Sequence, residues 1–248
     1  MKLWWRSALV GTVAYLLFLL MAAPAAKVLP VFQSRLQNVQ LAGVEGSLWS
    51  GKAAQLDVSP LQLKDVNWSF RPFGLFVGCA VFDIHGRLQA QRIQAKVGST
   101  FLGRPYLSDV RGRISANDLF YWLGLKQVQL DGQLDFDIED VEWSESGLPA
   151  MAGTASWSLA QLVSPVALVL GKVQLVTQIE DAVTRGRLET TGGALLVQAD
   201  VELKPDGAYR FDANIQQKGD VPQAVSKFLS TFAEYKDGNY RLEWADKL

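Results

Sequence analysis

The sequence predicts a mainly β protein, with one N-terminal transmembrane helix followed by a predominantly antiparallel β-sheet domain that carries one or two short helices. Residues 8–26 contain no charged side chain. Through much of residues 39–248, apolar and polar side chains alternate with the period of two that half-buried strands show. Because 49% of the residues are hydrophobic, the chain has enough apolar surface to fold as one sizeable domain.

The uncharged stretch at residues 8–26 is 19 residues long. A helix needs roughly 20 residues to cross the hydrocarbon core of a bilayer. Basic side chains precede the stretch within residues 1–7, which predicts that this end stays in the cytoplasm. We expect residues 27–38 to form a linker and residues 39–248 to form the domain on the other side of the membrane.

A cleaved signal peptide is the alternative interpretation of the N-terminal segment. Ala23-Pro24-Ala25 fits the small-residue pattern that precedes a cleavage site. However, proline occupies the middle position, and the apolar stretch exceeds the roughly 7–15 residues usual for a signal peptide. Pro24 can equally mark the end of a spanning helix. The length of the stretch therefore favours an uncleaved anchor.

The clearest pair of strands lies near the C-terminus. Side chains alternate between apolar and polar from Leu195 to Leu203 and again from Tyr209 to Ile215. Pro205-Asp206-Gly207 lies between them and supplies turn chemistry. The pattern predicts an antiparallel hairpin with one apolar face. Similar alternation predicts strands around residues 66–70, 134–138 and 173–179.

Two short helices are predicted within the β domain. The first is capped by Asn117 or Asp118 and ends at Gly124. The second begins near Pro222, and a turn then leads to a last strand at residues 240–244. Helical spacing gives the second helix one apolar stripe, which consists of Val225, Phe228, Leu229 and Phe232.

No pattern in the chain predicts an enzyme. His85 is the only histidine and Cys79 the only cysteine, and neither lies in a known nucleophile motif or in a set of zinc ligands. The stretch from Gly46 to Lys52 approaches a phosphate-binding loop, but Ala53 stands where the loop needs a hydroxyl group. We therefore predict no catalytic, cofactor-binding or metal-binding residues. The net charge of -1 gives no electrostatic reason to expect nucleic-acid binding.

A run of acidic side chains at residues 131–142 is the strongest remaining candidate for a site. Carboxylates at alternate positions of a strand share a face and can bind calcium through their oxygens. Leu134, Phe136 and Ile138 occupy the opposite face, so the acids have the pattern of a solvated outer surface. This second interpretation is favoured, because the spacing also fails the calcium-loop pattern.

Residues 46–51 form a glycine-rich block that reads G-S-L-W-S-G, and a short segment with Trp68 and Arg71-Pro72 follows it. The block and this segment resemble the type II secretion system protein N family of Gram-negative bacteria, also called general secretion pathway protein N. The resemblance runs along the chain, and the block is its most specific part. We interpret the block as structural, because its glycines let strands bend and approach while the bulky Trp49 packs into the core. The residues that carry the resemblance are Gly46, Ser47, Leu48, Trp49, Ser50, Gly51, Trp68, Arg71 and Pro72.

The resemblance implies an accessory subunit of the type II protein secretion system. Such a subunit would lie in the bacterial cell inner membrane as a single-pass protein, with a cytoplasmic N-terminus and the bulk of the chain in the periplasm. It would aid the assembly of the system or the export of folded periplasmic proteins across the outer membrane. Its partners would be other inner-membrane components of the system, contacted through exposed sheet edges or the anchor helix.

A more distant resemblance to AsmA-like envelope proteins implies a curved sheet with an apolar inner face. The alternative function is then to bind or move lipid in an apolar β groove. The same side chains can instead pack together as an ordinary core, which is the favoured interpretation. The residues concerned are Leu195, Val197, Val201, Tyr209, Phe211 and Ile215.

Overall fold

The structure, a computed structural model, describes residues 11–12, 15, 24–27, 39–58, 61–122, 124, 127–144 and 147–247. Most of the predicted anchor at residues 8–26 and of the predicted linker at residues 27–38 lies outside these described residues. Within the described part of the chain, no helix has the length and apolar character that crossing a membrane requires.

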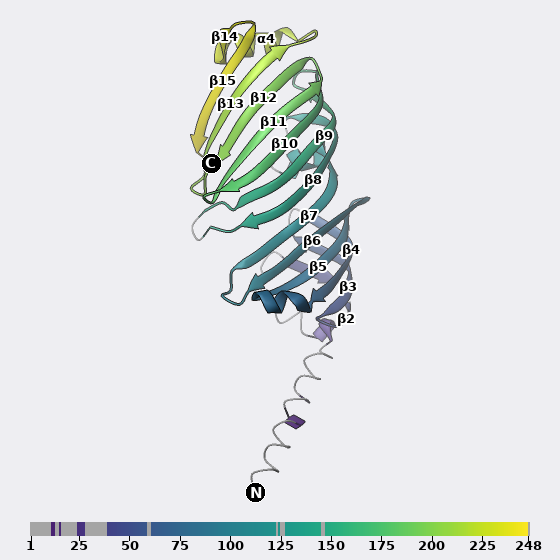
Figure 1. Cartoon of the computed structure of the whole chain (residues 1–248). Helices are drawn as coiled ribbons and strands as arrows, with labels where there is room; N and C mark the ends of the chain where they lie inside the picture. Colours follow the sequence, from purple (N-terminus) through teal and green to yellow (C-terminus); the bar gives the residue numbers. More distant parts are fainter. Residues whose placement is uncertain are drawn as a thin grey trace. The chain divides into compact units, whose positions relative to one another are not determined.

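The chain divides into two compact units, Met1–Arg92 and Ile93–Leu248. Both consist mainly of antiparallel strands, and only a few short helices accompany them (Figure 1). This confirms the predicted β class.

In the first unit, successive strands pair with one another in the order β1-β3-β4-β5, and β2 pairs with β3. A short 3-10 helix, η1, connects β4 to β5. Strand β4 contains the predicted strand around residues 66–70. The elements are β1 (Val39–Ala42), β2 (Glu45–Gly46), β3 (Ser50–Val58), β4 (Leu61–Arg71), η1 (Pro72–Val77) and β5 (Cys79–Leu88).

In the second unit, strands β6 to β13 again pair in sequence order, and β15 then pairs with β13 on one side and β14 on the other, which gives the order β6-β7-β8-β9-β10-β11-β12-β13-β15-β14. Strand β6 begins at the boundary between the units. The strands are β6 (Gln91–Thr100), β7 (Pro105–Ser115), β8 (Gln129–Glu142), β9 (Ala150–Ser164), β10 (Leu168–Glu180), β11 (Val183–Gly192), β12 (Leu195–Leu203), β13 (Ala208–Gln217), β14 (Glu234–Lys236) and β15 (Asn239–Lys247), and the helices are α3 (Ala116–Trp122) and α4 (Gln223–Phe232).

The predicted hairpin is present as β12 and β13. Val197 lies opposite Ile215 and Val201 opposite Phe211, so the apolar side chains of both strands share one face. Gly207 in the connecting turn has a φ of 85°, which suits glycine. The predicted strands around residues 134–138 and 173–179 are confirmed as parts of β8 and β10.

Both predicted helices form, with differences at their ends. Helix α3 starts at Ala116, before the predicted caps, because it follows β7 directly and buries the small Ala116 side chain. Helix α4 begins immediately after Pro222, as predicted. A short strand that the sequence did not predict, β14, follows α4 and pairs with β15.

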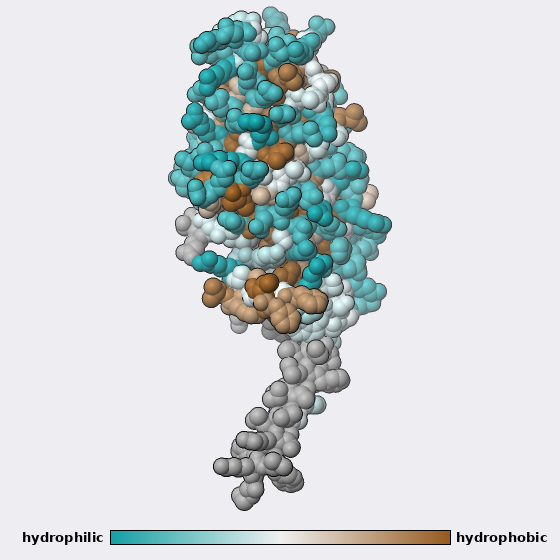
Figure 2. All heavy atoms as spheres, viewed as in Figure 1, coloured by the Kyte–Doolittle hydropathy of each residue, from teal (hydrophilic) through white to brown (hydrophobic). Residues whose placement is uncertain are grey.

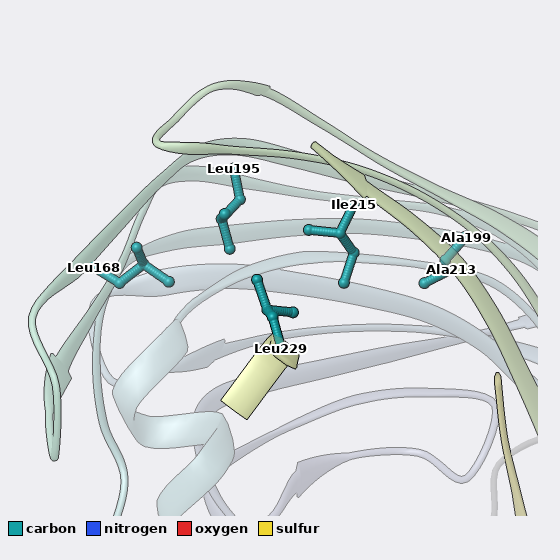
Figure 3. Close-up of a cluster of buried hydrophobic side chains, with 6 residues drawn as sticks. All are labelled: Leu168, Leu195, Ala199, Ala213, Ile215 and Leu229. Carbon is teal, nitrogen blue, oxygen red and sulfur yellow. The ribbon is translucent and has the colours of Figure 1, made fainter. Parts of the chain in front are cut away.

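The buried core of the second unit lies where α4 packs against the sheet. Figure 3 shows the sheet curving over Leu229 of α4, with Leu195 and Ile215 pointing toward it. The predicted apolar stripe of α4 is only partly buried. Leu229 is 3% exposed, whereas Phe228 and Phe232 are about half exposed. The rings of these two phenylalanines pack against each other with their centroids 4.8 Å apart. The buried cluster consists of Leu168, Leu195, Ala199, Ala213, Ile215 and Leu229.

Candidate functional site

The glycine-rich block forms a tight connection between β2 and β3. Gly46 lies opposite Gly51 across the two strands. The backbone N–H of Ser47 donates to the carbonyl of Ser50 at 2.9 Å, and the backbone N–H of Ser50 donates to Ser47 Oγ at 3.1 Å. Gly46 has a φ of 93°, a conformation that L side chains rarely adopt. The two serines and the glycine therefore fix the turn locally.

Trp68 of β4 lies over this turn. Its Nε1 atom donates to the carbonyl of Leu48 at 3.1 Å and to that of Ser47 at 3.3 Å. Gly51 makes room for the ring, since a Cβ at this position would lie 2.4 Å from Trp68 Cζ2. The turn and the indole therefore fit together only when residue 51 has no side chain.

The remaining residues of the motif gather at the same end of β4. The Trp49 and Phe70 rings pack edge-on with their centroids 4.8 Å apart, and Trp49 is half-buried. Arg71 forms an ion pair with Asp83 of β5, and Pro72 is the first residue of η1. The structure thus brings together every residue on which the family resemblance rests.

The described residues near the N-terminus reach this same turn. Pro24 forms an isolated antiparallel bridge with Ser47, and Ala25 is fully buried. Pro24 and Ala25 belong to the last part of the predicted anchor at residues 8–26. The end of that segment therefore contacts the turn between β2 and β3.

One face of the second unit's sheet is apolar, and we refer to it as the apolar face. Its residues lie opposite one another from strand to strand: Leu134 opposite Trp157, Trp157 opposite Val173, and Leu175 opposite Leu188. These side chains are half-buried rather than fully buried. Because the strands described in this unit belong to one sheet, none of them forms a second sheet over this face. The apolar face comprises Leu134, Phe136, Ile138, Trp157, Val173, Leu175, Ile179, Leu188, Val197, Val201 and Phe211.

Charged and polar side chains cover much of the face seen in Figure 2. Two carboxylates of the acidic run lie opposite arginines and bind them: Asp137 accepts from Arg111 Nε at 2.8 Å, and Asp135 accepts from Arg113 Nε at 2.5 Å. The hydrogen bond to Asp137 and the charge of that carboxylate raise the pKa of Arg111 above its usual value, so the guanidinium stays charged. The chemistry at these positions is cross-strand ion pairing on an exposed surface.

The last strand offers an open edge. Lys236 lies opposite Asn239 across the two-residue turn Asp237-Gly238, so their backbones are hydrogen-bonded to each other. Hydrogen-bonded positions alternate along an antiparallel pair, so Glu243 and Ala245 also direct their backbone groups toward the β14 side. Strand β14 ends at Lys236 and reaches only as far as Arg241 on β15. Beyond that point no described strand pairs with β15 on this side.

Comparison with known proteins identifies the family to which these features belong. The family model for protein N of the type II secretion system (T2SS) matches residues 37–243, which include the motif and nearly all the strands of both units. The chain belongs to the type II secretion system protein N family. The match confirms the family that the motif around Trp49 indicated.

Individual relatives bear the same family name along most of the chain. The type II secretion system protein N of Vibrio cholerae serotype O1 is 30% identical over 202 residues, which cover 78% of this chain and 79% of that protein. The protein N of Aeromonas hydrophila is 26% identical over 238 residues, or 92% of each chain. The protein N of Pectobacterium carotovorum is 24% identical over 221 residues, or 88% of this chain and 86% of that protein. No solved structure matches the chain significantly.

The positions of two features of this protein N family member were not predicted from its sequence. Helix η1 follows the motif at Pro72, and the uncharged residues after that proline were its only signal. The open edge of β15 depends on where β14 ends, and three residues are too short a stretch to show an alternating pattern.

Proposed function

We propose that this protein N family member is an accessory inner-membrane subunit of the type II secretion system that aids assembly or export of folded periplasmic proteins across the outer membrane. The match of the family model over residues 37–243 carries this proposal. In it, residues 8–26 cross the membrane once, residues 1–7 remain cytoplasmic, and the β-rich domain at residues 39–248 is periplasmic. The uncharged length of residues 8–26 supports this topology.

The subunit acts in this proposal by binding other components of the secretion system, without turnover. The open edge of β15 supplies the physical route, since a strand of a partner can extend the sheet there through main-chain hydrogen bonds. Alternating side chains at the edge, among them Glu243 and Trp244, would then select the partner. Glu243 and Lys247 also place charges at this edge, which disfavours indiscriminate pairing between copies.

The motif at Gly46–Gly51 has a structural role in the same proposal. Trp68 and Gly51 hold the turn on which the end of the predicted anchor rests through Pro24. A fixed turn at this point gives the periplasmic domain a defined connection to the membrane segment. This role uses no cofactor and no metal.

Deletion of the gene tests the function directly. We expect folded cargo of the secretion system to accumulate in the periplasm, with the outer membrane still impermeable to detergent and dyes. Complementation with the full chain should restore secretion. Normal secretion combined with a leaky envelope would contradict the assembly role and favour lipid handling.

Binding of lipid on the apolar face is the second candidate function. Side chains such as Phe136, Trp157 and Leu175 remain half-buried, and no second sheet among the described strands of this unit covers them. Burial of an acyl chain would remove this apolar surface from water at roughly 25 cal/mol per Å². Near the other end of the face, α4 already packs over Leu195 and Ile215.

Crosslinking of a photoreactive phospholipid to the full chain in nanodiscs tests whether lipid binds on the apolar face. Leu175→Asn places a polar group on the apolar face, whereas Val176→Asn changes the next residue on the opposite face, where Val176 is 48% exposed. Lipid binding on the apolar face predicts crosslinks in β10 that Leu175→Asn reduces and Val176→Asn leaves unchanged. Equal crosslinking of all three proteins would contradict it.

A further inference from the structure

Helix η1 presents a cluster of apolar side chains to solvent. Phe73, Phe76 and Val77 are 81%, 87% and 78% exposed, and Leu75 is 43% exposed. Figure 2 shows apolar side chains gathered over this part of the molecule. Residues 72–82 contain no charged side chain. Contiguous apolar surface of this kind marks an interaction site in a soluble domain.

The apolar cluster lies at a defined end of the first unit. Ser69, near the end of β4, lies opposite Ser50 at the start of β3. Because η1 follows β4 directly and the turn at Gly46–Gly51 leads into β3, η1 and the turn occupy the same end of this sheet. Pro24 bridges to Ser47 of that turn. The end of the proposed anchor and the exposed apolar helix therefore lie at one end of the same unit.

We propose that η1 inserts into the lipid surface of the membrane that the anchor crosses. The inference rests on the proposed topology, in which the membrane segment ends at about Pro24, the residue that contacts the turn. A bilayer is then the apolar phase nearest to η1. Phenylalanine, leucine and valine side chains can enter the boundary between headgroups and acyl chains to a depth of about 5–10 Å.

The surroundings of η1 fit a lipid surface better than a charged partner. Arg71 and Asp83 flank the uncharged segment and form an ion pair with each other. The segment itself offers phenylalanine rings and aliphatic groups, with the Phe73 and Phe76 centroids 6.4 Å apart. Insertion gives the periplasmic domain a second contact with the membrane and so limits its rotation about the anchor.

Depth-dependent fluorescence quenching tests the proposal on the full chain. The single native cysteine is replaced by Cys79→Ser, and one new cysteine for an NBD label is introduced per variant by Phe76→Cys, Phe228→Cys or Leu17→Cys. Phe228 is the matched control, because it is an exposed helical phenylalanine, 47% accessible, in the other unit. Each protein is reconstituted into vesicles of phosphatidylethanolamine and phosphatidylglycerol, with or without nitroxide-labelled lipid.

We expect lipid nitroxides to quench the label at position 76 and the label at position 17, and to leave the label at position 228 unchanged. Quenching at 17 without quenching at 76 would overturn the insertion of η1 while leaving the anchor in place. Loss of quenching at both positions would refute the anchor as well. Equal quenching at 76 and 228 would show non-specific contact with lipid and also overturn the proposal.

A second set of variants tests the insertion of η1 without an NBD label attached to it. Phe73→Ser combined with Phe76→Ser should make the neighbouring native Cys79 more accessible to a membrane-impermeant maleimide on the vesicle surface. Phe228→Ser combined with Phe232→Ser, the matched pair on α4, should leave the Cys79 labelling rate unchanged. Equal Cys79 labelling rates in both pairs and in the parent chain would contradict shielding by lipid. A dimer crosslinked through Cys79 would show that a second copy, and not lipid, covers η1, and would also overturn the proposal.

Discussion

Trp68 connects the glycine-rich turn to the sheet through its ring and through its one side-chain hydrogen-bond donor, Nε1. The ring occupies the space that Gly51 leaves open, and Nε1 donates to the carbonyls of Ser47 and Leu48. The ring contact and the two hydrogen bonds hold the turn against β4, so both contribute to the stability of this end of the first unit. Substitutions at the two sides of the contact separate the contribution of the donor from that of the space.

Trp68→Phe keeps an aromatic ring and removes the donor. We expect the free energy of unfolding to fall by about 1–2 kcal/mol, since two partly buried carbonyls lose their partner. Trp244→Phe is the control, because Trp244 is 45% exposed and its Nε1 donates to the Tyr209 hydroxyl at 3.3 Å. The free energy of unfolding of each variant is measured by urea denaturation in detergent, with circular dichroism as the signal. Equal losses in the two variants would show that the donor of Trp68 has no special role.

Gly51→Ala tests the space beside the ring. The new Cβ would lie 2.4 Å from Trp68 Cζ2 and 2.7 Å from the carbonyl oxygen of Glu45, so the strands must move apart. We expect a loss of about 1–3 kcal/mol in the free energy of unfolding, in the range of overpacked sites. Gly219→Ala is the control, because its Cβ would meet Ala194 at an ordinary 3.6 Å. A stable Gly51→Ala variant in the same urea titration would refute the close approach.

The sequence indicated which residues belong to the motif but not how they interact. Glycines around a tryptophan predicted a close approach, and Gly51 makes one. Trp49 was expected to enter the core, yet it is half-buried and it is Trp68 that occupies the space beside Gly51. Alternation along β4 cannot reveal this, because the partner of Trp68 is a turn about 20 residues earlier in the chain.

Helix α4 is held to the sheet by one well-buried side chain. Leu229→Ala should lower the free energy of unfolding by about 2–4 kcal/mol, because Leu229 fills the space between Leu195 and Ile215. Phe228→Ala should lower it by only about 1 kcal/mol, since it loses mainly the contact with Phe232. Comparing the two by urea denaturation tests which face of α4 is inward. A larger loss for Phe228→Ala would reverse that assignment.

The edge of β15 can be blocked without breaking its pairing to β13. Ala245→Pro removes a backbone N–H that points to the open side, and proline is tolerated at such positions. We expect unchanged stability, together with loss of co-purification of other secretion components with the full chain. Ala245→Ser keeps the N–H and serves as the control, expected to behave as the parent. Retention of partners by the stable Ala245→Pro protein would exclude strand addition at this edge.

Individual elements could be predicted where alternation or helical spacing extends over several residues. Strands β12 and β13 and helix α4 satisfy this condition, and their positions agree closely with expectation. Helix η1 does not, because its six residues make up only about two turns of a 3-10 helix, too few for a period to be recognised in the sequence. The proline at its start and Gly78, with a φ of 80° at its end, mark its limits only once the structure is known.

At the scale of the whole molecule, the described strands pair largely in chain order, with β15 between β13 and β14, and the sheet keeps both an open edge and an apolar face for partners. Sequence alternation predicted the apolar side chains of residues 195–215 but could not distinguish a closed core from an open face. That distinction depends on what packs over the sheet: α4 covers Leu195 and Ile215, whereas Phe136 and Leu175 remain half-buried. The open edge of β15 thus corresponds to the proposed assembly function, and the apolar face corresponds to lipid binding.

Site-specific photocrosslinking in secreting cells tests the central claim most directly. A photoreactive phenylalanine analogue is placed in the full chain at Glu243 on the open edge and, separately, at Phe136 on the apolar face. The assembly role predicts a crosslink from position 243 to another component of the secretion system, and its loss when Ala245→Pro is added. Crosslinks from position 136 to lipid, with none from position 243 to protein, would contradict it.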